Sequence, residues 1–381
     1  MPPQRDRHVE KLRLGVVGLG EGRSIISAAL ASSMWELVRI CDLNEQLCRD
    51  RAAEFSFPRW TTRMQELLED STIDVIAIYT PDTLHAKHIA ASLSAGKHVI
   101  CTKPLIDNLA DAPGLLDAAK RSGRHVFVGQ SCRFFAPMMR QREDFEAGRH
   151  GRLFSVEAHY HADNRWFLQR NWARGGGLRW LFGGLSHPVD LVRWYLPDVT
   201  EVMGYGLLTD NGRQLGLTHP DAMHFVMATD DGRIARVSGC FSSPTVPAPR
   251  DSHITCVLRG ELGVSQADYG ELRYTTHFTG QGPRHYSLED QAPYYFRFEG
   301  RTHHAGEYQN YIEYFARCIA AGQTPRPDLQ EGIGTVAVLA AMERSLQTKR
   351  PVRVQEMLRD DPALGLAGEP VRSPDRPTGP A

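Results

Sequence analysis

The feature that most constrains the fold is a short apolar strand that runs directly into a glycine-rich turn and then a helix. The strand covers residues 12–17, the turn reads Gly18-Leu19-Gly20-Glu21-Gly22-Arg23, and residues 24–33 read as a helix. These are the parts of a dinucleotide-binding βαβ unit, in which the backbone approaches the pyrophosphate at the helix N-terminus. Arg23 stands where the G-x-G-x-x-G pattern expects its third glycine. We predict cofactor binding by Gly18, Gly20, Gly22 and Arg23; a glycine-rich turn without a ligand is the alternative.

A carboxylate ends the second predicted strand, residues 37–41. Asp42 follows Gly20 by 42 − 20 = 22 residues, close to the roughly 20 expected for the carboxylate that accepts the ribose hydroxyls. Leu43 and Asn44 come next, with no adjacent arginine to receive a 2′-phosphate. The sequence therefore predicts NAD rather than NADP as the cofactor.

A lysine follows a central strand in the stretch from Gly96 to Leu105. Gly96 ends a helical run, residues 98–101 make an apolar strand, and Pro104 keeps Lys103 out of the helical region. A lysine at the carboxyl end of such a strand points into the ligand crevice of an open α/β sheet, where desolvation suits it to proton transfer. A solvated lysine at the start of a loop is the alternative reading.

Further strands near 74–79 and 125–129 and helices near 83–95 and 108–121 complete a predicted cofactor domain. The turn after residue 79 feeds a helix and contains Thr80, Pro81 and His85, and the last strand leads to Gln130. We predict that these four residues, with Lys103, also contact the cofactor. A surface histidine at a helix start is the alternative for His85.

Together these residues resemble the glucose–fructose oxidoreductase / inositol dehydrogenase (Gfo/Idh/MocA) family. The resemblance extends through the junction 130–134 to Gly175-Gly176-Gly177 and to His187-Pro188-Val189-Asp190 with Trp194. It implies a Rossmann domain followed by an α/β domain with a large, mostly antiparallel sheet that often carries an oligomer interface. We therefore expect a cofactor domain over 1–132, a substrate and oligomerisation domain over 133–357, and a disordered tail over 358–381. A homo-oligomer, dimer or tetramer, follows from the same resemblance.

The chain departs from the family pattern in two places. Thr102 stands where the family usually has glutamate, and Gly183 stands four residues before His187, where the family usually has a catalytic carboxylate. The predicted catalytic set is thus reduced to Lys103 and His187. Asp190 lies on the same helical face as His187, where it either orients the imidazole or caps the helix.

The second domain opens with a helix near 136–147 and a strand over 153–161 whose alternation puts His159 and His161 on one face and Tyr160 on the other. Arginines and tryptophans follow, and arginines grip anionic groups through two-pronged contacts. We expect part of this cluster to bind an anionic group of a sugar, with pairing to scattered carboxylates as the alternative. The cluster comprises Arg165, Trp166, Arg170, Trp172, Arg174, Arg179 and Trp180. The predicted substrate-binding residues are Arg133, His159, Tyr160, Arg165, Arg179 and His187.

Composition excludes several classes of partner. The net charge is −1, so nothing favours nucleic acid, and no apolar run approaches a membrane span. Seven scattered cysteines without a C-x-x-C pair suggest reduced thiols in a cytoplasmic protein. His303 and His304 have no third ligand at metal spacing, so we expect no metal.

The leading hypothesis is an NAD-dependent oxidoreductase acting on a sugar, a sugar derivative or a polyol. Lys103 and His187 then move the hydroxyl proton while hydride passes to or from the nicotinamide. One alternative is a glycosidase that keeps its NAD and works by oxidation, elimination, water addition and reduction. The other is a regulator that binds NAD and a sugar without turnover.

Overall fold

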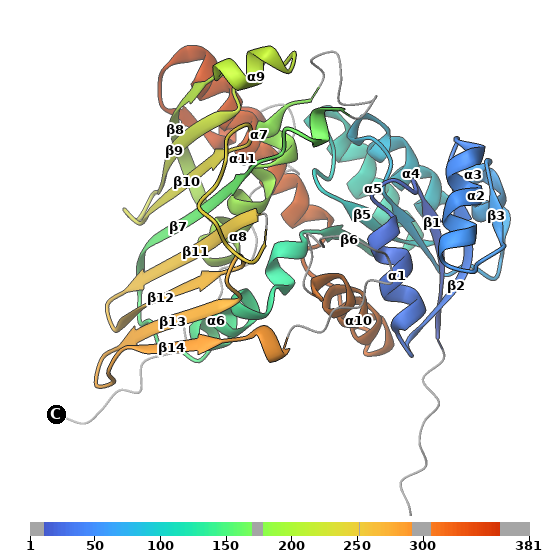
Figure 1. The fold of residues 1–381 in the computed structure, drawn as a ribbon, viewed down its shortest axis with the longest axis horizontal. Coiled ribbons are helices and arrows are strands. Elements are labelled where there is room, and N and C mark those ends of the chain that lie inside the picture. The colour runs from blue at the N-terminus through green and yellow to red at the C-terminus, as the bar shows by residue number, and fades with distance from the viewer. Residues whose placement is uncertain (1–10, 170–177, 251, 292–305, 359–381) are drawn as a thin grey trace, which may run out of the picture. The chain divides into compact units, whose positions relative to one another are not determined.

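The computed structural model describes residues 11–169, 178–250, 252–291 and 306–358, drawn in colour in Figure 1. The chain divides into two compact units, with residues up to 129 and 294–332 in the first and the remainder in the second. Arg170, Trp172, Arg174, the three glycines at 175–177, the His303-His304 pair and the tail after residue 358 lie outside the described residues.

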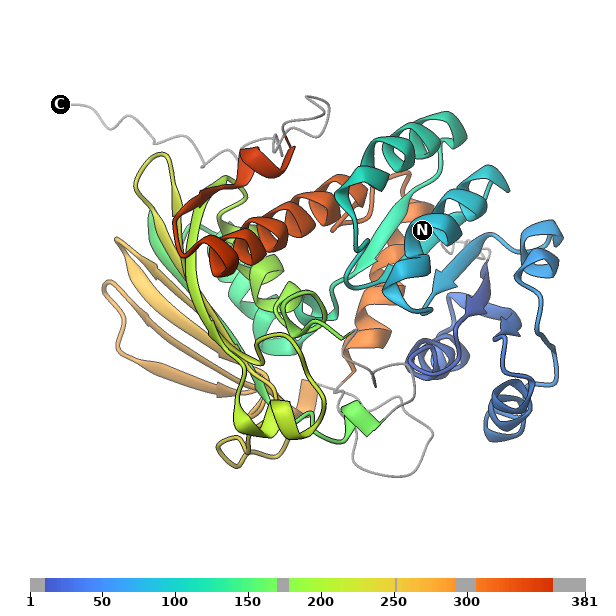
Figure 2. The ribbon, with the colours of Figure 1, turned by 90° about the horizontal axis from the view of Figure 1, so that it is seen from above.

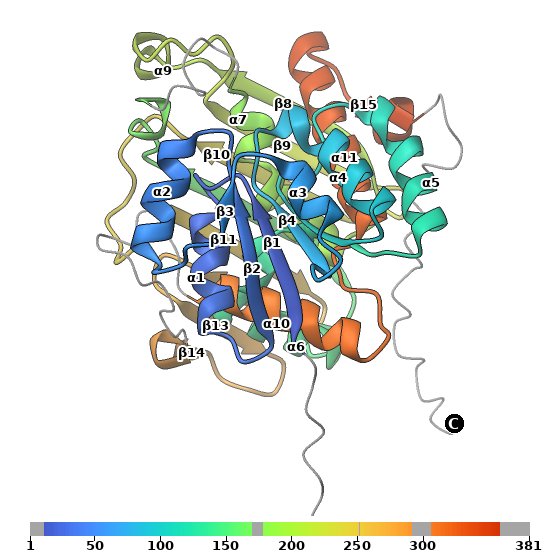
Figure 3. The same ribbon diagram turned by 90° about the vertical axis from the view of Figure 1, so that its right-hand side faces the viewer.

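The first unit is built on a six-stranded parallel sheet in the order β3-β2-β1-β4-β5-β6, the arrangement of a Rossmann domain (Figure 3). Its strands read as continuous apolar runs because helices cover both faces, and every residue of β4 is buried. Its elements are β1 (Leu12–Val17), α1 (Arg23–Ala31), β2 (Trp35–Cys41), α2 (Glu45–Glu54), β3 (Trp60–Thr61), α3 (Met64–Glu69), β4 (Val75–Ile78), η1 (Asp82–Leu84), α4 (His85–Ser94), β5 (His98–Thr102), η2 (Leu109–Asp111), α5 (Ala112–Ser122) and β6 (Val126–Gly129).

Helix α10 (Glu307–Ala320) also packs in this first unit, although it lies far downstream in the sequence. The Trp35 indole donates to the carbonyl oxygen of Ile312 at 3.0 Å, and the ring of Phe127 lies 5.6 Å from that of Phe315. The apolar face of α10 is thus buried against β2 and β6. The predicted second domain, residues 133–357, includes this helix, whereas the structure places it in the first unit. Its packing partners Trp35 and Phe127 precede it by more than 180 residues in the sequence.

The second unit is built on a nine-stranded sheet in the order β14-β13-β12-β11-β7-β10-β9-β8-β15. All of its strand pairs are antiparallel except β7 with β10, so the predicted mostly antiparallel sheet is confirmed. Its strands are β7 (Leu153–Ala162), β8 (Val199–Leu207), β9 (Ala222–Thr229), β10 (Ile234–Cys240), β11 (Ser252–Gly260), β12 (Gly263–Asp268), β13 (Arg273–Phe278), β14 (Arg284–Ser287) and β15 (Val352–Arg353).

Helices cover one face of this sheet, as Figure 2 shows. Buried and exposed residues alternate along β9 because every second side chain turns toward those helices. The helical elements are η3 (Ser131–Phe134), α6 (Ala136–Glu146), η4 (Phe167–Gln169), α7 (Trp180–Gly183), α8 (Ser186–Tyr195), α9 (Asp210–Gln214), η5 (Glu289–Gln291), α11 (Leu329–Thr348), which begins in the first unit, and η6 (Val354–Leu358). Among the described residues, no helix has the length and apolar character needed to cross a membrane.

A buried histidine, His150, makes the stability of the second unit sensitive to acid. Its Nε2 lies 2.7 Å from the hydroxyl of Ser265, its side chain is fully buried, and burial lowers its pKa to about 4. Because the ring takes up a proton near 6.5 in the unfolded chain, this site stabilises the fold fully above about pH 6.5. That stabilisation is lost as the pH falls through 6.5 toward 4.

We predict that His150→Gln, whose amide can still reach Ser265, loses less stability than the wild type between pH 7 and pH 4. The difference should reach up to about 3 kcal/mol, the linkage value of such a pKa shift, measured by urea unfolding at each pH. His277→Gln, at an exposed position of β13, is the matched control and should follow the wild-type profile. Equal acid sensitivity of His150→Gln and the wild type would contradict the assignment.

Candidate active site

The glycine turn after β1 is shaped by two glycines that cannot carry a side chain. Gly18 has φ +89°, and a Cβ there would lie 2.5 Å from the carbonyl of Tyr79. A Cβ on Gly22 would overlap the carbonyl oxygen of Gly18. Gly20 differs, because among the described residues a Cβ there would meet no atom within 4 Å. Gly18 and Gly22 therefore fold the turn, while Gly20 leaves space beside the N-terminus of α1, the kind of position that suits a pyrophosphate.

Asp42 lies directly after β2 and is oriented by the backbone. Its Oδ2 accepts from the amide of Leu19 in the glycine turn at 2.8 Å, and its Oδ1 accepts from the amide of Asn44 at 2.9 Å. Each carboxylate oxygen keeps a lone pair for a ribose hydroxyl. Leu43 is 86% exposed and offers no positive charge to a 2′-phosphate. The residues present thus fit the ribose of NAD.

Arg23, predicted to contact the cofactor, has a structural contact instead. Its Nε donates to Glu54 at 2.6 Å, and Glu54 also receives the guanidinium of Arg51 at 2.8 Å. Arg51 in turn donates to the carbonyl of Leu19 at 3.1 Å. Arg23 lies at the start of α1, close to α2, and its side chain takes part in this ion-pair network. We therefore leave Arg23 out of the candidate site.

Three predicted cofactor residues lie on the loops that follow β4 and β5. Thr80 and Pro81 precede η1, and Lys103 follows β5 directly and is half-buried. His85, also predicted to contact the cofactor, is 1% exposed, and both of its ring nitrogens face backbone carbonyls. His85 is therefore buried beneath the loops rather than placed on their surface, which corrects the prediction of a cofactor contact.

Gln130 is the residue after β6 and is 2% exposed. Its Oε1 is buried without a hydrogen-bond partner among the described residues. A buried acceptor left unsatisfied costs about 1–3 kcal/mol, so this oxygen suits an amide donor on a bound ligand. The open space at Gly20, the oriented Asp42 and this acceptor all fit a nicotinamide dinucleotide.

His187 is the second residue of α8 in the second unit and lies on the helix-covered side of the sheet. The ring of Tyr160 lies 6.0 Å from that of His187, at 61°. Burial raises the pKa of Tyr160, so its hydroxyl stays protonated at neutral pH. Two more aromatic rings extend this group. The Phe241 ring centre lies 5.2 Å from that of Tyr160 and 4.7 Å from that of Trp180, on which it stacks. Phe241 follows a strand end, and no sequence pattern distinguished it.

His159 was predicted to bind substrate together with Tyr160, but the two side chains emerge on opposite faces of β7. The Nδ1 of His159 lies 2.8 Å from the hydroxyl of Ser238, and burial, followed by the charge of Arg236, lowers its pKa to about 4. Since Tyr160 shares its face with His187, His159 turns away from that group. Strand alternation thus permits only one of the two residues on the face of His187, and substrate binding by His159 stays a prediction.

The three predicted substrate arginines are each paired with a carboxylate of the chain. Arg133 binds Asp190 through two prongs, at 2.6 and 2.8 Å, with both side chains buried. Arg165 binds Asp163 at 2.6 and 2.7 Å, and Arg179 binds Glu343 at 3.0 Å. Arg133 is thus a core residue rather than a substrate ligand, because its guanidinium is enclosed. Asp190, expected to orient His187 or to cap α8, binds Arg133.

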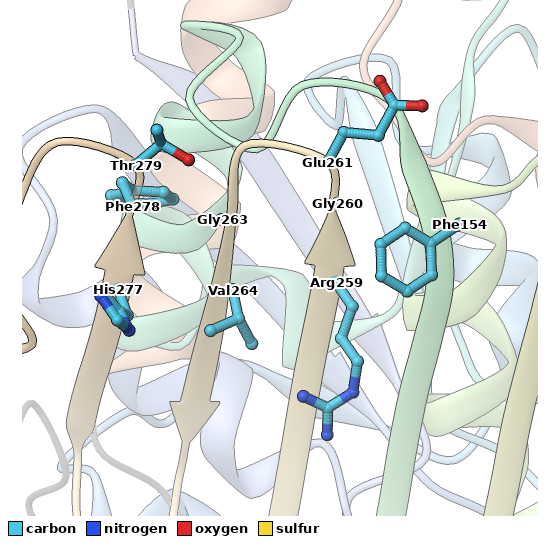
Figure 4. A pocket seen from close by; sticks show the side chains of 9 residues that line it. All are labelled: Phe154, Arg259, Gly260, Glu261, Gly263, Val264, His277, Phe278 and Thr279. Carbon is cyan, nitrogen blue, oxygen red and sulfur yellow. The ribbon is translucent and has the colours of Figure 1, made fainter.

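A hollow of about 400 Å³ lies at the hairpin between β11 and β12 (Figure 4). It contains none of the predicted site residues, and its charged Arg259 is paired with Glu157 at 3.2 Å. It is therefore separate from the candidate site. The lining residues are Phe154, Arg259, Gly260, Glu261, Gly263, Val264, His277, Phe278 and Thr279. Among the described residues, no group of three or more histidine, cysteine or acidic side chains could hold a metal ion.

A parallel dinucleotide-type sheet and a large mixed sheet in one chain define the class of two-part NAD-binding oxidoreductases. The sequence matches the oxidoreductase family with an NAD-binding Rossmann fold over residues 12–130 and the C-terminal alpha/beta domain of that family over residues 142–354. The chain belongs to this family, Gfo/Idh/MocA, and its cofactor is NAD.

Named relatives act on cyclic or sugar alcohols. The chain is 31% identical over 190 residues to 1-carboxy-3-chloro-3,4-dihydroxycyclohexa-1,5-diene dehydrogenase of Comamonas testosteroni, covering 48% of this chain and 47% of that protein. It is 25% identical over 351 residues to D-xylose 1-dehydrogenase (NADP(+)) 2 of Haloferax volcanii, covering 90% and 98%. The match spans about half the length of the first of these relatives.

Solved structures share the fold. Levoglucosan dehydrogenase in complex with NADH and levoglucosan superimposes with a TM-score of 0.78 at 22% identity, covering 91% of this chain and 100% of that one. At this identity the likeness establishes the fold alone. The predicted order, a Rossmann domain followed by a domain with a mostly antiparallel sheet, is confirmed.

Substitutions at Gly20 and Gly22 test cofactor binding and protein stability separately. We predict that Gly22→Ala destabilises the protein by about 2 kcal/mol or more, because its methyl group overlaps the backbone of the turn. Gly20→Ala should change the free energy of unfolding by less than about 0.5 kcal/mol yet weaken NADH binding at least about ten-fold. Urea unfolding and NADH fluorescence titration measure the two effects.

Gly282→Ala is the matched control, since a Cβ there also meets nothing within 4 Å and it lies outside the cofactor unit. It should change neither quantity. Unchanged NADH affinity in Gly20→Ala would show that the space beside Gly20 does not receive the pyrophosphate.

Proposed function

We propose that this protein is an NAD-dependent oxidoreductase that transfers hydride between the cofactor and a secondary alcohol carbon of a sugar-like substrate. The observation that carries the proposal is the position of Lys103 immediately after β5, in the sheet that also holds the glycine turn and Asp42. The carboxyl ends of parallel strands form the ligand-binding edge of such a sheet. Lys103 therefore belongs to the same edge as the cofactor residues.

In this proposal NAD supplies the hydride acceptor or donor, and the chain's own residues bind, orient and move the proton. Asp42 accepts the ribose hydroxyls, and the amides at the N-terminus of α1 receive the pyrophosphate. Lys103, as a neutral amine, removes the proton from the substrate hydroxyl during oxidation. His187 is the second residue to which this proposal gives a part in proton transfer. In the reverse direction the lysine ammonium returns the proton to the oxygen.

The paired arginines favour an uncharged polyol or sugar over an anionic one. A substrate carboxylate would have to displace Asp163 from Arg165 or Glu343 from Arg179. Each displacement would leave the displaced aspartate or glutamate without its arginine partner. The names of the D-xylose and levoglucosan relatives support a neutral cyclic alcohol. The carboxylated diene diol of the Comamonas testosteroni relative supports the anionic alternative.

Gly183 favours a second candidate function, redox-neutral glycoside cleavage with retained NAD. The family carboxylate is absent from this position, and among the described residues a Cβ on Gly183 would have Leu178 as its neighbour, at 3.7 Å. Gly183 thus supplies no carboxylate where one would ordinarily assist alcohol oxidation. A chromogenic glycoside separates the two functions, because the glycosidase releases the aglycone with no net NADH.

We predict NADH formation from NAD⁺ with at least one of levoglucosan, D-xylose and myo-inositol. Lys103→Met should lower kcat by roughly 10²–10⁴-fold, the usual contribution of general acid–base catalysis. His187→Asn should lower kcat in the same range. Lys87→Met and His219→Asn, at exposed positions, are the matched controls and should retain wild-type kcat. Rates follow from NADH absorbance at saturating substrate.

Wild-type turnover by Lys103→Met would remove the lysine from proton transfer and end the proposed mechanism. Tight NAD that never exchanges, together with aglycone release, would replace it with the glycosidase. Binding of NAD and sugar without either product would indicate a regulator.

We further propose that the protein forms a homo-oligomer through the outer face of its nine-stranded sheet. Neighbouring strands expose large apolar side chains there, with Tyr205 65%, Val226 56%, Ile234 51% and Phe154 51% exposed. Exposed large apolar side chains on adjacent strands of one sheet suit an interaction surface. A second copy of the chain is the expected occupant, in line with the resemblance to a family whose large sheet often carries the oligomer interface.

We predict that the wild type elutes as a dimer or tetramer and that Val226→Glu shifts it toward the monomer. The added carboxylate would be desolvated in the interface. Light scattering after size-exclusion chromatography measures the mass. Met139→Glu, on α6 and 37% exposed, is the control and should keep the wild-type mass. A monomeric wild type at micromolar concentration would refute the interface.

A further inference from the structure

His85, the first residue of α4, contacts two backbone carbonyls from two different loops. Its Nδ1 lies 2.8 Å from the carbonyl oxygen of Pro104, and its Nε2 lies 2.8 Å from the carbonyl oxygen of Thr80. The side chain is 1% exposed. Water therefore does not compete for either ring nitrogen, and both short contacts are made inside the first unit.

The two carbonyls belong to the loops that carry the proposed cofactor and proton-transfer residues. Thr80 lies in the loop after β4, and Pro104 follows Lys103 in the loop after β5. The loop after β4 also packs against the glycine turn, because a Cβ on Gly18 would lie 2.7 Å from the amide nitrogen of Thr80. A continuous set of close contacts thus runs from the glycine turn through His85 to the backbone beside Lys103.

The chemistry of the two contacts determines what the ring must do. A carbonyl oxygen only accepts hydrogen bonds, and a neutral imidazole has a single N–H. With one proton, the second nitrogen would direct its lone pair at a carbonyl oxygen 2.8 Å away. Two donated hydrogen bonds require a proton on each nitrogen, and hydrogen bonds from a charged donor are the stronger kind.

A neighbouring histidine provides the comparison. His88, one turn further along α4, has its Nδ1 3.1 Å from the side-chain hydroxyl of Thr80, a group that both donates and accepts. Burial, and next the proximity of His85, lowers the pKa of His88. Within the described part of the chain, the His88 ring contacts the same loop but forms no hydrogen bond with the loop after β5, so His88 is a matched position without the two-loop connection.

We propose that His85 is a positioning residue that donates from both ring nitrogens and thereby fixes the Lys103 loop to the loop after β4. The backbone beside Lys103 is then held at a constant position relative to the glycine turn and the bound dinucleotide. An effect of His85 on the turnover rate through Lys103 rests on the proposed function. Its effect on NADH binding does not, because that effect concerns the cofactor site alone.

Three variants separate the two hydrogen bonds. The amide of His85→Asn reaches the position of Nδ1 and retains the Pro104 contact, whereas that of His85→Gln reaches the position of Nε2 and retains the Thr80 contact. His85→Phe keeps the ring volume and neither donor. We expect the Kd of NADH to rise about 3- to 10-fold in each single-donor variant and about 30-fold or more in His85→Phe, following the loss of one or two hydrogen bonds.

Hydrogen–deuterium exchange should show faster exchange in residues 80–84 and 102–106 of the Phe variant, with the β1 and β2 strands unchanged. His88→Asn is the control and should leave NADH affinity within about two-fold of the wild type, since it disturbs no backbone carbonyl. Histidine-selective ¹⁵N NMR of the wild type supplies an independent measurement. The His85 signals are assigned by their absence from His85→Asn, and both nitrogens should show the chemical shifts of hydrogen-bond donors.

A His85 ring in which only one nitrogen has the chemical shift of a donor would overturn the two-donor assignment. Equal NADH affinity of the Asn, Gln and Phe variants would overturn the positioning role. If His85→Phe does not fold, the two amide variants and the NMR spectrum still decide the question. Full activity of Lys103→Met would refute the proposed chemistry, yet the NADH affinities of the His85 variants would still test the link between the loops.

Discussion

The close approach of the glycine turn to the end of β4 is the constraint on which the first unit depends. Gly18 lies so near the Tyr79 carbonyl that no side chain fits, and Gly22 closes the turn on Gly18 itself. Asp42 then accepts from Leu19 inside the same turn. Backbone atoms of three neighbouring strand ends are therefore fixed relative to one another before any ligand binds. Preorganisation of this kind reduces the free-energy cost of ordering the site on binding.

The second unit has a different internal constraint, a buried ion pair. Arg133 and Asp190 are almost fully enclosed, and the two-pronged geometry offsets much of the cost of removing both charges from water. Removing either partner would leave a buried charge, at a cost of about 3–5 kcal/mol. Since Asp190 lies one turn after His187 in α8, the pair also fixes the helix that presents the imidazole. An arginine interpreted from sequence as a substrate ligand thus acts on the site through the helix.

Local patterns predicted the parts of the structure that local physics determines. The apolar runs gave β1 at its observed bounds and β4, β5 and β6 to within a residue or two, because buried parallel strands need continuous apolar residues. Spacing placed Asp42 directly after the second strand, where the structure has it. The placement of α10 in the first unit, the pairing of Arg179 with Glu343 and the burial of His85 depend on contacts that only the folded chain makes. Alternation separated His159 from Tyr160 but did not indicate which face holds α8.

The glycine at position 183 limits how the proton can be handled. The family pattern usually has a catalytic carboxylate there, and Gly183 supplies none. Asp190 is not a ready replacement, because both of its oxygens accept from Arg133. Tyr160 is half-buried, and its raised pKa keeps it neutral. In the proposed mechanism Lys103 is therefore the group that carries the charge change during the reaction.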